Sequence, residues 1–428
     1  MRPIGKSVSS TLSNHQYSLL PRLKPFKAPI SLISERVARQ QIQSTSSENE
    51  SNIQHVRSSR SQPLSICREP LSHVITERPV VNKPLTRRNI KCDDTLTYHY
   101  NETTDTRHIN WKRLYRNKSL IEKRWKEGKC KMRQFPSSGA DLVEHNGGIY
   151  CLQFNESILV TGSRDRYLKI WDIRTGSLIR TLKGHLGSVL CLQFDGRFLI
   201  SGSSDAALIV WDIHTAERIR TLRGHEESVL NVKFKDDVLV SCSKDRTVRI
   251  WHLSDDGKAT IRFVLRGHRA AVNAVQFKDD RVVSASGDRA IKIWDMNSGE
   301  CLKTLDSHSR GIACIEFDGK YIVSGSSDQT IKVWNAITGE CVHTLISHTD
   351  LVRTLQLDSQ SKRIISGSYD GTLKIWGLET GSLLNLTQAP LGRVLNLQFD
   401  FGRIICCSNL GKIIIYDFSH GIDTQFLS

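Results

Sequence analysis

The segment GHLGSVLCLQFDGRFLISGSSDAALIVWD (184–212) decides the fold of this chain. It holds three runs in which apolar and polar residues alternate, and Gly, Asp and Ser separate these runs. Such a pattern predicts three short strands joined by tight turns. The segment therefore predicts one compact unit of an all-β fold.

The same unit recurs through the second part of the chain. An aromatic residue closes each copy, at successive spacings of 40, 40, 43, 40, 42 and 40 residues: Trp171, Trp211, Trp251, Trp294, Trp334, Trp376 and Tyr416. This period and the Trp-Asp ending are typical of WD repeats, each of which forms a four-stranded propeller blade. Seven copies predict an all-β, seven-bladed WD-repeat β-propeller over residues 129–428.

Six copies also share His, Ser or Thr, Asp and Trp at fixed offsets, as in His185, Ser201, Asp205 and Trp211. Ser, His and Asp together are typical of a nucleophilic triad. Six copies of one constellation are not six active sites, so we interpret them as a hydrogen-bonded network that satisfies buried polar groups.

The seventh copy lacks this network. Its equivalent positions hold Pro390, Cys406, Leu410 and Tyr416. We therefore expect the segment KCKMRQF (129–135) to pair beside the last strand and close the ring, which removes the exposed sheet edges.

Charge divides the chain of 428 residues, whose net charge is +16. Residues 1–137 contribute +15, from 26 Lys and Arg against 11 Asp and Glu, and the remainder contributes +1. Residues 1–106 are rich in Ser, Arg and Pro and too poor in apolar groups to offset their chain entropy, so a basic, mostly disordered leader is expected.

A helical pattern follows the leader. Residues 107–131 place apolar side chains three and four residues apart, which predicts an amphipathic linker helix over 107–128. The helix is expected to dock this stripe on the propeller: Ile109, Trp111, Leu114, Tyr115, Leu120, Ile121 and Trp125.

Several function classes are excluded. No apolar run is long enough to span a membrane. The eleven cysteines form no CxxC pair, which argues against a disulfide framework or zinc site and suits a reducing cytoplasm or nucleus. No phosphate loop, GxSxG, HExxH or dinucleotide turn is present, so we expect no catalytic residue, no metal site and no cofactor.

Two sets of positions are expected to open onto one rim of the propeller channel, the residue before each conserved Asp and the first residues of each innermost strand. Neither set contains an acidic residue, and together they hold the cations Arg164, Lys244, Arg310, Arg353 and Arg393. The arginines belong to the fifth, sixth, seventh and first copies, which are consecutive around a closed ring. Arginine pairs with phosphate oxygens through two parallel bonds, so this pattern predicts an anion site with apolar contacts beside it. Those contacts come from Tyr150, Leu190, Leu230, Leu351 and Tyr369.

The chain resembles the F-box/WD-repeat substrate-receptor family, and within it the β-transducin repeat-containing branch. The resemblance covers residues 107–428 and is carried by GIYCLQF, SCSKDRTVRIW, GHRAAVNAVQF, SASGDRAIKIW, RGIACIEF, HTDLVRTLQL and SGSYDG. It implies a phosphopeptide-binding receptor that presents a doubly phosphorylated degron, Asp-Ser-Gly followed by a second Ser, to a cullin-RING (SCF-type) ubiquitin ligase.

The resemblance also implies roles for individual residues. Arg164 and Ser204, with Tyr150 beside them, match residues that hold one phosphoserine, and Arg310 with Ser327 matches those that hold the other. Arg353 and Tyr369 match residues that meet the degron's Asp. The other matching pocket positions are Leu230, Asn273, Gly287, Ala313, Leu351 and Arg393.

The F-box expected before the linker helix is not evident, because residues 40–100 are polar and Ser-rich. An SCF adaptor and a cullin are therefore expected partners only if docking occurs in another way, and a receptor without an F-box would shield its client instead. A non-catalytic scaffold is a second alternative, in which WDIR (171–174) docks a different cullin adaptor. Nucleic-acid binding through the leader is the least favoured, because interleaved aromatic residues and a known module are missing.

Overall fold

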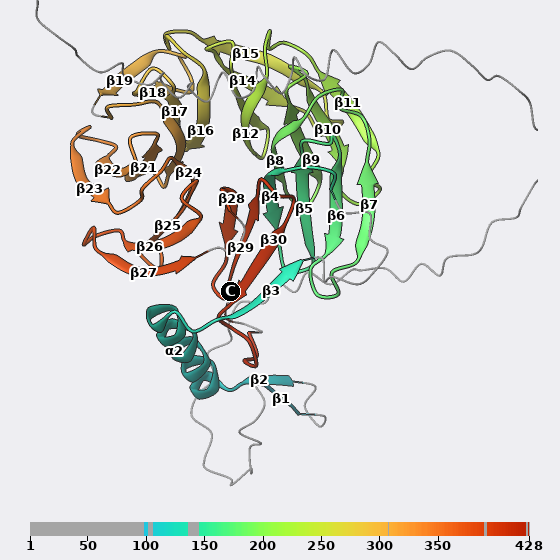
Figure 1. The fold of residues 1–428 in the computed structure, drawn as a ribbon. Coiled ribbons are helices and arrows are strands. Elements are labelled where there is room, and N and C mark those ends of the chain that lie inside the picture. The colour runs from blue at the N-terminus through green and yellow to red at the C-terminus, as the bar shows by residue number, and fades with distance from the viewer. Residues whose placement is uncertain are drawn as a thin grey trace, which may run out of the picture.

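The structure of the protein is a computed structural model that describes residues 98–101, 106–135, 145–306, 308–388, 392–424 and 427. The leader through residue 97, which was predicted to be disordered, lies outside the described residues, and so does Pro390. The predicted seven-bladed propeller is confirmed. Seven four-stranded antiparallel sheets surround a central channel (Figure 1).

The first three blades follow one another directly along the chain. Blade 1 contains β4 (Ile149–Phe154), β5 (Ile158–Ser163), β6 (Leu168–Asp172) and β7 (Leu178–Leu182). Blade 2 contains β8 (Val189–Phe194), β9 (Phe198–Ser203), β10 (Leu208–Asp212) and β11 (Arg218–Leu222). Blade 3 contains β12 (Val229–Lys235), β13 (Val238–Ser243), β14 (Val248–Leu253) and β15 (Ala259–Leu265).

The next three blades have the same strand order. Blade 4 contains β16 (Val272–Lys278), β17 (Arg281–Ser286), β18 (Ala290–Asp295) and β19 (Cys301–Asp306). Blade 5 contains β20 (Ile312–Phe317), β21 (Tyr321–Ser326), β22 (Thr330–Asn335) and β23 (Cys341–Ile346). Blade 6 contains β24 (Val352–Asp358), β25 (Arg363–Ser368), β26 (Thr372–Gly377) and β27 (Leu383–Gln388).

Blade 7 is built from both ends of the body. Its inner strands are β28 (Val394–Phe399), β29 (Arg403–Ser408) and β30 (Ile413–Asp417). Its outer strand is β3 (Lys131–Phe135), which pairs antiparallel with β30 from Lys131 opposite Asp417 to Phe135 opposite Ile413. The structure thus contains the closing pair expected from the sequence, in which β3 covers the edge that β30 would otherwise expose.

The hydrophobic core lies between the blades. Seven clusters of buried side chains fill the seven interfaces, and each draws residues from two neighbouring blades. Trp211 of blade 2, for example, packs in one cluster with Val160 and Leu168 of blade 1. The Trp that ends a repeat therefore fills the interface between two neighbouring blades, which explains why the repeat requires a large apolar side chain there.

The segment before the propeller corrects two predictions. Strands β1 (Tyr98–Asn101) and β2 (Thr106–Ile109) form an antiparallel hairpin, so part of the predicted leader and the first residues of the predicted helix are extended. Helix α2 (Trp111–Glu127) begins later than residue 107 because Asn110 caps it, accepting a hydrogen bond from the Arg113 amide at 3.1 Å. Gly128, at φ 68°, ends the helix in the left-handed conformation that favours glycine.

The predicted apolar stripe of α2 is only partly correct. The buried face consists of Leu114, Asn117, Ile121 and Trp125, spaced three or four residues apart. Trp111 and Tyr115 are 71% and 75% exposed, and Leu120 is also exposed. These three side chains lie outside the face that the helical period turns toward the propeller.

Trp125 anchors α2 to blade 7. Its ring stacks on Phe418 at 3.9 Å, and its indole nitrogen donates to the Phe401 carbonyl at 2.9 Å. Phe401 follows the end of β28. The helix therefore docks on the propeller face opposite to the one on which the innermost strands begin.

Candidate functional site

The two predicted sets of positions lie side by side because one backbone hydrogen bond joins them in every blade. The residue before each conserved Asp donates its amide to the carbonyl of the residue just before the innermost strand. In blade 1 the pair is Arg164 and Gly148 at 3.0 Å, and in blade 6 it is Tyr369 and Leu351 at 3.0 Å. The equivalent donors are Ser204, Lys244, Gly287, Ser327 and Asn409. Both predicted sets of positions thus lie on one face, which we call the rim face.

Five of the predicted residues gather where blades 6, 7 and 1 meet. Burial raises the pKa of the Tyr150 phenol, and the charges of Arg164 and Arg353 partly oppose this rise because both lie close to the ring. Tyr369 is a further neighbour of Tyr150. The Arg393 guanidinium lies 5.3 Å from the centre of the Tyr369 ring. Three guanidinium groups and two tyrosines therefore share one region.

Ser204 lies beside this region in blade 2. Its amide donates to the Ser188 carbonyl at 2.9 Å, and the Ser188 hydroxyl donates to the Arg164 carbonyl at 3.3 Å. This chain of bonds holds the turn of blade 1 next to the turn of blade 2. Arg164, Ser204 and Tyr150 can therefore contact one anion together.

Arg310 and Ser327 form a second group in blade 5. The Ser327 amide donates to the Gly311 carbonyl at 2.9 Å, and Arg310 immediately precedes Gly311. Gly311 packs directly on Gly287 of blade 4, since a Cβ at Gly311 would lie 3.1 Å from the Gly287 Cα. The exposed Arg310 guanidinium thus stands at the boundary between blades 4 and 5.

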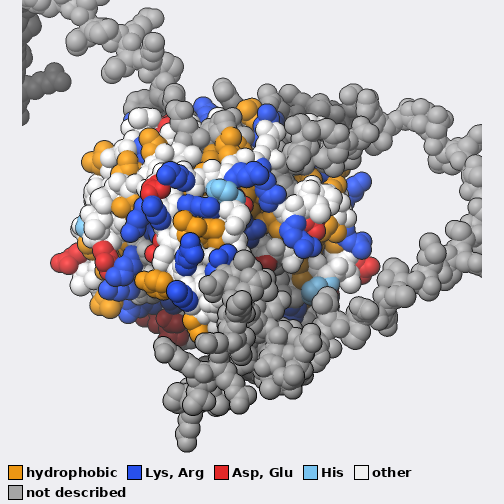
Figure 2. Space-filling view, turned by 90° about the horizontal axis from the view of Figure 1, so that it is seen from below, with side chains coloured by type: hydrophobic (Ala, Val, Ile, Leu, Met, Phe, Trp, Pro, Cys, Tyr) orange, Lys and Arg blue, Asp and Glu red, His pale blue; other side chains and the backbone are white. Residues whose placement is uncertain are grey.

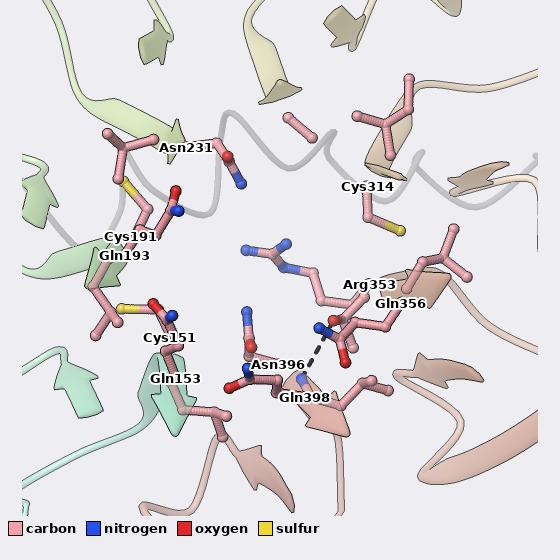
Figure 3. Close-up of a pocket in the computed structure, with 18 of the residues that line it drawn as sticks. Cys151, Gln153, Cys191, Gln193, Asn231, Cys314, Arg353, Gln356, Asn396 and Gln398 are labelled. Atoms are coloured by element: carbon pink, nitrogen blue, oxygen red, sulfur yellow. Dashed lines mark hydrogen bonds between the residues drawn. The ribbon is translucent and has the colours of Figure 1, made fainter. Parts of the chain in front are cut away.

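Arg353 lies nearest to the propeller axis. Its side chain projects into the middle of the channel, with Asn231 and Asn396 on other sides (Figure 3). The surrounding cavity has a volume of about 180 Å³, and Leu190, Leu230 and Ala313 also line it. An acidic side chain that enters the channel from the rim face would meet the Arg353 guanidinium.

The remaining predicted residues contribute less accessible surface. Leu351 is buried, and Asn273 uses its side-chain amide to donate to the Ile312 carbonyl at 2.7 Å. Lys244 is paired with Glu227 at 3.1 Å, so its charge is balanced. Among the five predicted cations, the four arginines Arg164, Arg310, Arg353 and Arg393 therefore remain without an acidic partner in the described residues, and we call them the arginine arc.

Sequence reasoning missed the charged groups deeper in the channel. Five glutamines occupy one position near the end of the innermost strands, and Lys233 and Glu316 replace them in blades 3 and 5. Gln153 shows their function, because it accepts from the Phe194 amide and donates to the Phe194 carbonyl, at 2.7 and 2.9 Å. The signal was the glutamine that recurs at this position, whose side chain accepts from a backbone amide of the next blade in blades 1, 2, 6 and 7.

Burial raises the pKa of Glu316, although the charge of Lys233 and a hydrogen bond from Gln276 at 2.6 Å oppose this rise. Glu316 and Lys233 both line the cavity below Arg353. The channel is therefore polar along its length and not an apolar binding pocket.

The Ser, His and Asp constellation is structural. In blade 2, His185 contacts Asp205 through Nδ1 at 3.1 Å and Ser201 through Nε2 at 2.8 Å, and the Trp211 indole donates to Ser201 at 2.9 Å. Every hydroxyl of this kind is buried under the indole that it accepts from, so none is available as a nucleophile. The described residues also hold no group of three or more side chains that could bind a metal ion.

Positive charge alone does not single out the rim face. Figure 2 views the side that carries α2 and β27 in Figure 1, and its uncovered part shows many Lys and Arg side chains among hydrophobic ones and fewer acidic ones. In the described part of the chain, no helix is long and apolar enough to cross a bilayer. What distinguishes the rim face is the ordered placement of its arginines around one channel.

Comparison with known proteins supports the WD-repeat propeller fold. The family model described as WD domain, G-beta repeat matches residues 137–172, 176–212, 216–252, 259–295, 299–335 and 339–377, more than half of the chain. These matches contain the three inner strands of blades 1 to 6, and blade 7, which they leave out, is the one that lacks the buried network. The crystal structure of the computationally designed Ika8 protein is similar with a TM-score of 0.54 and 29% identity, over 64% of this chain and 98% of that one.

Curated relatives match over a shorter stretch. The probable E3 ubiquitin ligase complex SCF subunit sconB of Aspergillus clavatus is 42% identical over 77 residues, which is 18% of this chain and 10% of the relative. The protein of the same name in Arthroderma benhamiae is 40% identical over 82 residues, which is 19% of this chain and 11% of the relative. The chain thus spans about a tenth of the length of these relatives.

Proposed function

Because this chain belongs to the WD-repeat family (WD domain, G-beta repeat), we propose that it is a non-catalytic substrate receptor of an SCF-type ubiquitin ligase. In this proposal the arginine arc binds a doubly phosphorylated degron of the client protein. The similarity to sconB proteins, which are named as SCF subunits, supports the ligase context. The proposed degron chemistry rests on sequence motifs that resemble the β-transducin repeat-containing branch, such as SCSKDRTVRIW and HTDLVRTLQL.

The observation that carries the proposal is the set of four guanidinium groups from consecutive blades on one face. Four like charges repel one another, so the arrangement does not contribute to folding stability. Arginine forms paired, charge-assisted bonds with phosphate, and a concave mouth strengthens the attraction. A peptide with two phosphates at a fixed spacing complements such an arc better than a single anion does.

The geometry suggests how the peptide is divided among the residues. One phosphoserine lies at Arg164, Ser204 and Tyr150, and the second at Arg310 and Ser327. An acidic side chain between them enters the channel toward Arg353 and Tyr369. Arg393 is held over Tyr369 and adds positive charge to the same side of the mouth.

The alternative with a different cullin adaptor gains no support from the WDIR segment. Trp171 and Ile173 are buried, and Asp172 accepts hydrogen bonds from the Arg174 and Thr175 amides at 2.8 Å. Three of the four residues are thus buried or bonded within blade 1, and only Arg174 is exposed to a partner. The shielding alternative depends on whether the chain has an F-box, and residues 40–97, where one would be expected, lie outside the described residues.

We further propose that the protein acts in the cytoplasm, the nucleus or both. The nine cysteines among the described residues are all free thiols, and six of them are buried. Reducing compartments keep such thiols unpaired.

Affinity purification tests the proposal in cells with the proteasome inhibited. The full chain is compared with Arg310→Ala/Arg353→Ala and with Arg180→Ala, which removes an exposed arginine of the outer strand β7. We expect an F-box-binding adaptor and a cullin with all three proteins, and phosphorylated clients with the wild type and Arg180→Ala only. Equal recovery of phosphoproteins by the double variant contradicts degron binding at the arc, and recovery without adaptor and cullin favours shielding.

A further inference from the structure

We propose that the rim face carries an additional anion subsite over blade 4, formed by Arg269, Arg289 and Arg310, which binds an acidic stretch of the client next to its phosphorylated segment. The inference rests on the proposed function, because it extends the same site outward from the phosphate held at Arg310. The subsite would select clients that carry Asp or Glu residues beside the degron, a preference that the arginine arc alone does not give.

Arg269 and Arg289 lie on either side of one carboxylate. The Arg269 amide donates to Asp288 Oδ2 at 2.8 Å, and Arg289 follows Asp288 in the chain. Asp288 is already engaged by His268 at 2.9 Å and by the Ala290 amide at 3.0 Å. Both arginine side chains are exposed, and within the described residues neither forms an ion pair. Their charges are therefore free for a ligand.

The backbone of Arg310 lies close to the turn that carries Arg289, because blades 4 and 5 are neighbours in the ring and touch there (Figure 1). Gly311 packs on Gly287, and these two glycines lie one residue from Arg310 and two residues from Arg289. A Cβ at Gly287 would have the Ala270 methyl group as its nearest neighbour, at 3.5 Å. The backbone that connects the three arginine positions thus carries only glycine and alanine at Gly287, Gly311 and Ala270, so an extended peptide can approach it closely.

Other blades lack this combination. In blade 3, Glu226 takes the place of Arg269, with its amide 3.1 Å from Asp245 Oδ2, so an acidic side chain accompanies Arg246. Lys244 of the same blade is paired with Glu227. In blade 2 the corresponding positions are Leu186 and Ala206. At blade 4 the described residues place two arginines without an ion pair next to the backbone of Arg310, and the exposed Asp306, which lies opposite Ala290 across β18 and β19, is an acidic side chain nearby.

The shape of the subsite favours a peptide over a small molecule. None of the three arginines lines the cavity in the channel. Carboxylates on an extended chain can meet separate guanidinium groups without an enclosed pocket. Because the client is already bound through its phosphates, the same chain supplies these carboxylates at high effective concentration.

Binding of the full chain to synthetic peptides tests the inference. The peptides contain the Asp-Ser-Gly degron with both serines phosphorylated, extended at either end by three Glu or by three Gln. We expect one Glu extension to bind roughly fivefold more tightly than its Gln counterpart at low salt, as for two or three exposed ion pairs, and the gain to shrink as salt rises.

The variant Arg269→Gln/Arg289→Gly is expected to abolish this gain while it still binds the Gln-extended peptide. Arg289 has φ 77°, and glycine occupies the same position in blade 6 as Gly371 at φ 79°, so the glycine substitution relieves strain and leaves folding intact. A thermal melt at or above the wild-type midpoint verifies this. Arg246→Gly is the matched control, at the same turn position with φ 70°, and is expected to keep the gain.

The two levels of the proposal fail separately. Equal binding of the Glu and Gln extensions, or a gain that survives in the double variant, overturns the subsite while degron binding stands. If the doubly phosphorylated peptides bind no better than their unphosphorylated forms, the proposed function and the subsite are both overturned.

Discussion

Asp205 shows at the scale of one residue how the blades are held together. Its carboxylate accepts hydrogen bonds from the His185 ring and from the Leu186 and Ala207 amides, at 3.1, 2.8 and 3.0 Å. His185 in turn contacts the Ser201 hydroxyl, which accepts from the Trp211 indole. The Asp205 carboxylate, in the turn between β9 and β10, thus links this turn to the loop that precedes the innermost strand β8.

Replacing Asp205 by Ala is expected to cost roughly 3 kcal/mol of unfolding free energy, because three donors lose an ionised acceptor in a mostly buried position. Chemical denaturation of the isolated protein measures this loss. Glu217→Ala, at an exposed position of the same blade, is the control and should change stability by no more than about 0.5 kcal/mol. A wild-type midpoint for Asp205→Ala would contradict a stabilising network.

The same carboxylates make stability depend on acid. Burial alone would raise the pKa of Asp205, but the hydrogen bonds from His185 and the backbone outweigh it and lower the pKa to about 2. The pKa values of Asp245, Asp288, Asp328 and Asp370 lie well below the ordinary range for the same reason. A carboxyl whose folded pKa is depressed stabilises the fold above its unfolded pKa, and this contribution is lost as pH falls through the folded pKa.

We therefore expect the unfolding free energy to fall steeply as the pH drops from about 4 to about 2, because the unfolded chain binds protons at these carboxyls there while the folded protein keeps them largely ionised. Asp205→Asn cannot ionise, so its stability should decline less over this window, by on the order of 2 kcal/mol. Urea denaturation at several pH values compares the two proteins. Parallel pH profiles for both would show that Asp205 does not contribute.

At the scale of secondary-structure elements, α2 and β3 compensate for the missing network of blade 7. Cys406 and Tyr416 stand where the other blades have Ser and Trp, and both are buried in the cluster that contains Trp125 and Phe418. Arg124 of α2 also donates to the Phe418 and His420 carbonyls, at 2.9 and 2.8 Å. Apolar packing from outside the repeat thus replaces the polar bonds inside it.

Trp125→Ala is expected to destabilise the propeller by about 3–5 kcal/mol, because it removes a buried ring that packs on blade 7. Trp111→Ala is the matched control, since Trp111 belongs to the same helix but is 71% exposed. It should cost no more than about 0.5 kcal/mol. Similar thermal midpoints for the two variants would contradict the docking of α2.

The elements also show what the sequence could and could not predict. The strands and the closing role of β3 followed from the repeat, because alternation and turn residues are local signals. The start of α2 and its buried face did not, because Asn110 and the shape of blade 7 decide them. Trp111 and Tyr115 fit an apolar stripe in the sequence, yet both are exposed because they lie outside the face that α2 turns toward blade 7.

At the scale of the whole molecule, ring closure brings distant residues together. Arg164 and Arg393 are 229 positions apart in the sequence, yet blades 7 and 1 are neighbours through β28 and β4. The repeat period alone indicated that blades 5, 6, 7 and 1 are consecutive, so the positions of the arginine arc could be predicted. The pairing of Lys244 with Glu227 and the charges inside the channel could not, because they depend on side-chain directions.

The most direct test of the account measures the affinity of the full chain for one Asp-Ser-Gly peptide carrying zero, one or two phosphates. The account predicts that each phosphate strengthens binding, and that Arg310→Ala and Arg353→Ala each weaken binding of the doubly phosphorylated peptide by roughly 1.5–3 kcal/mol, the range for charge-assisted bonds. Arg180→Ala should leave it unchanged. Equal affinity for the three peptides, or an arc variant that binds like the wild type, would contradict the claim that the arginine arc binds phosphate.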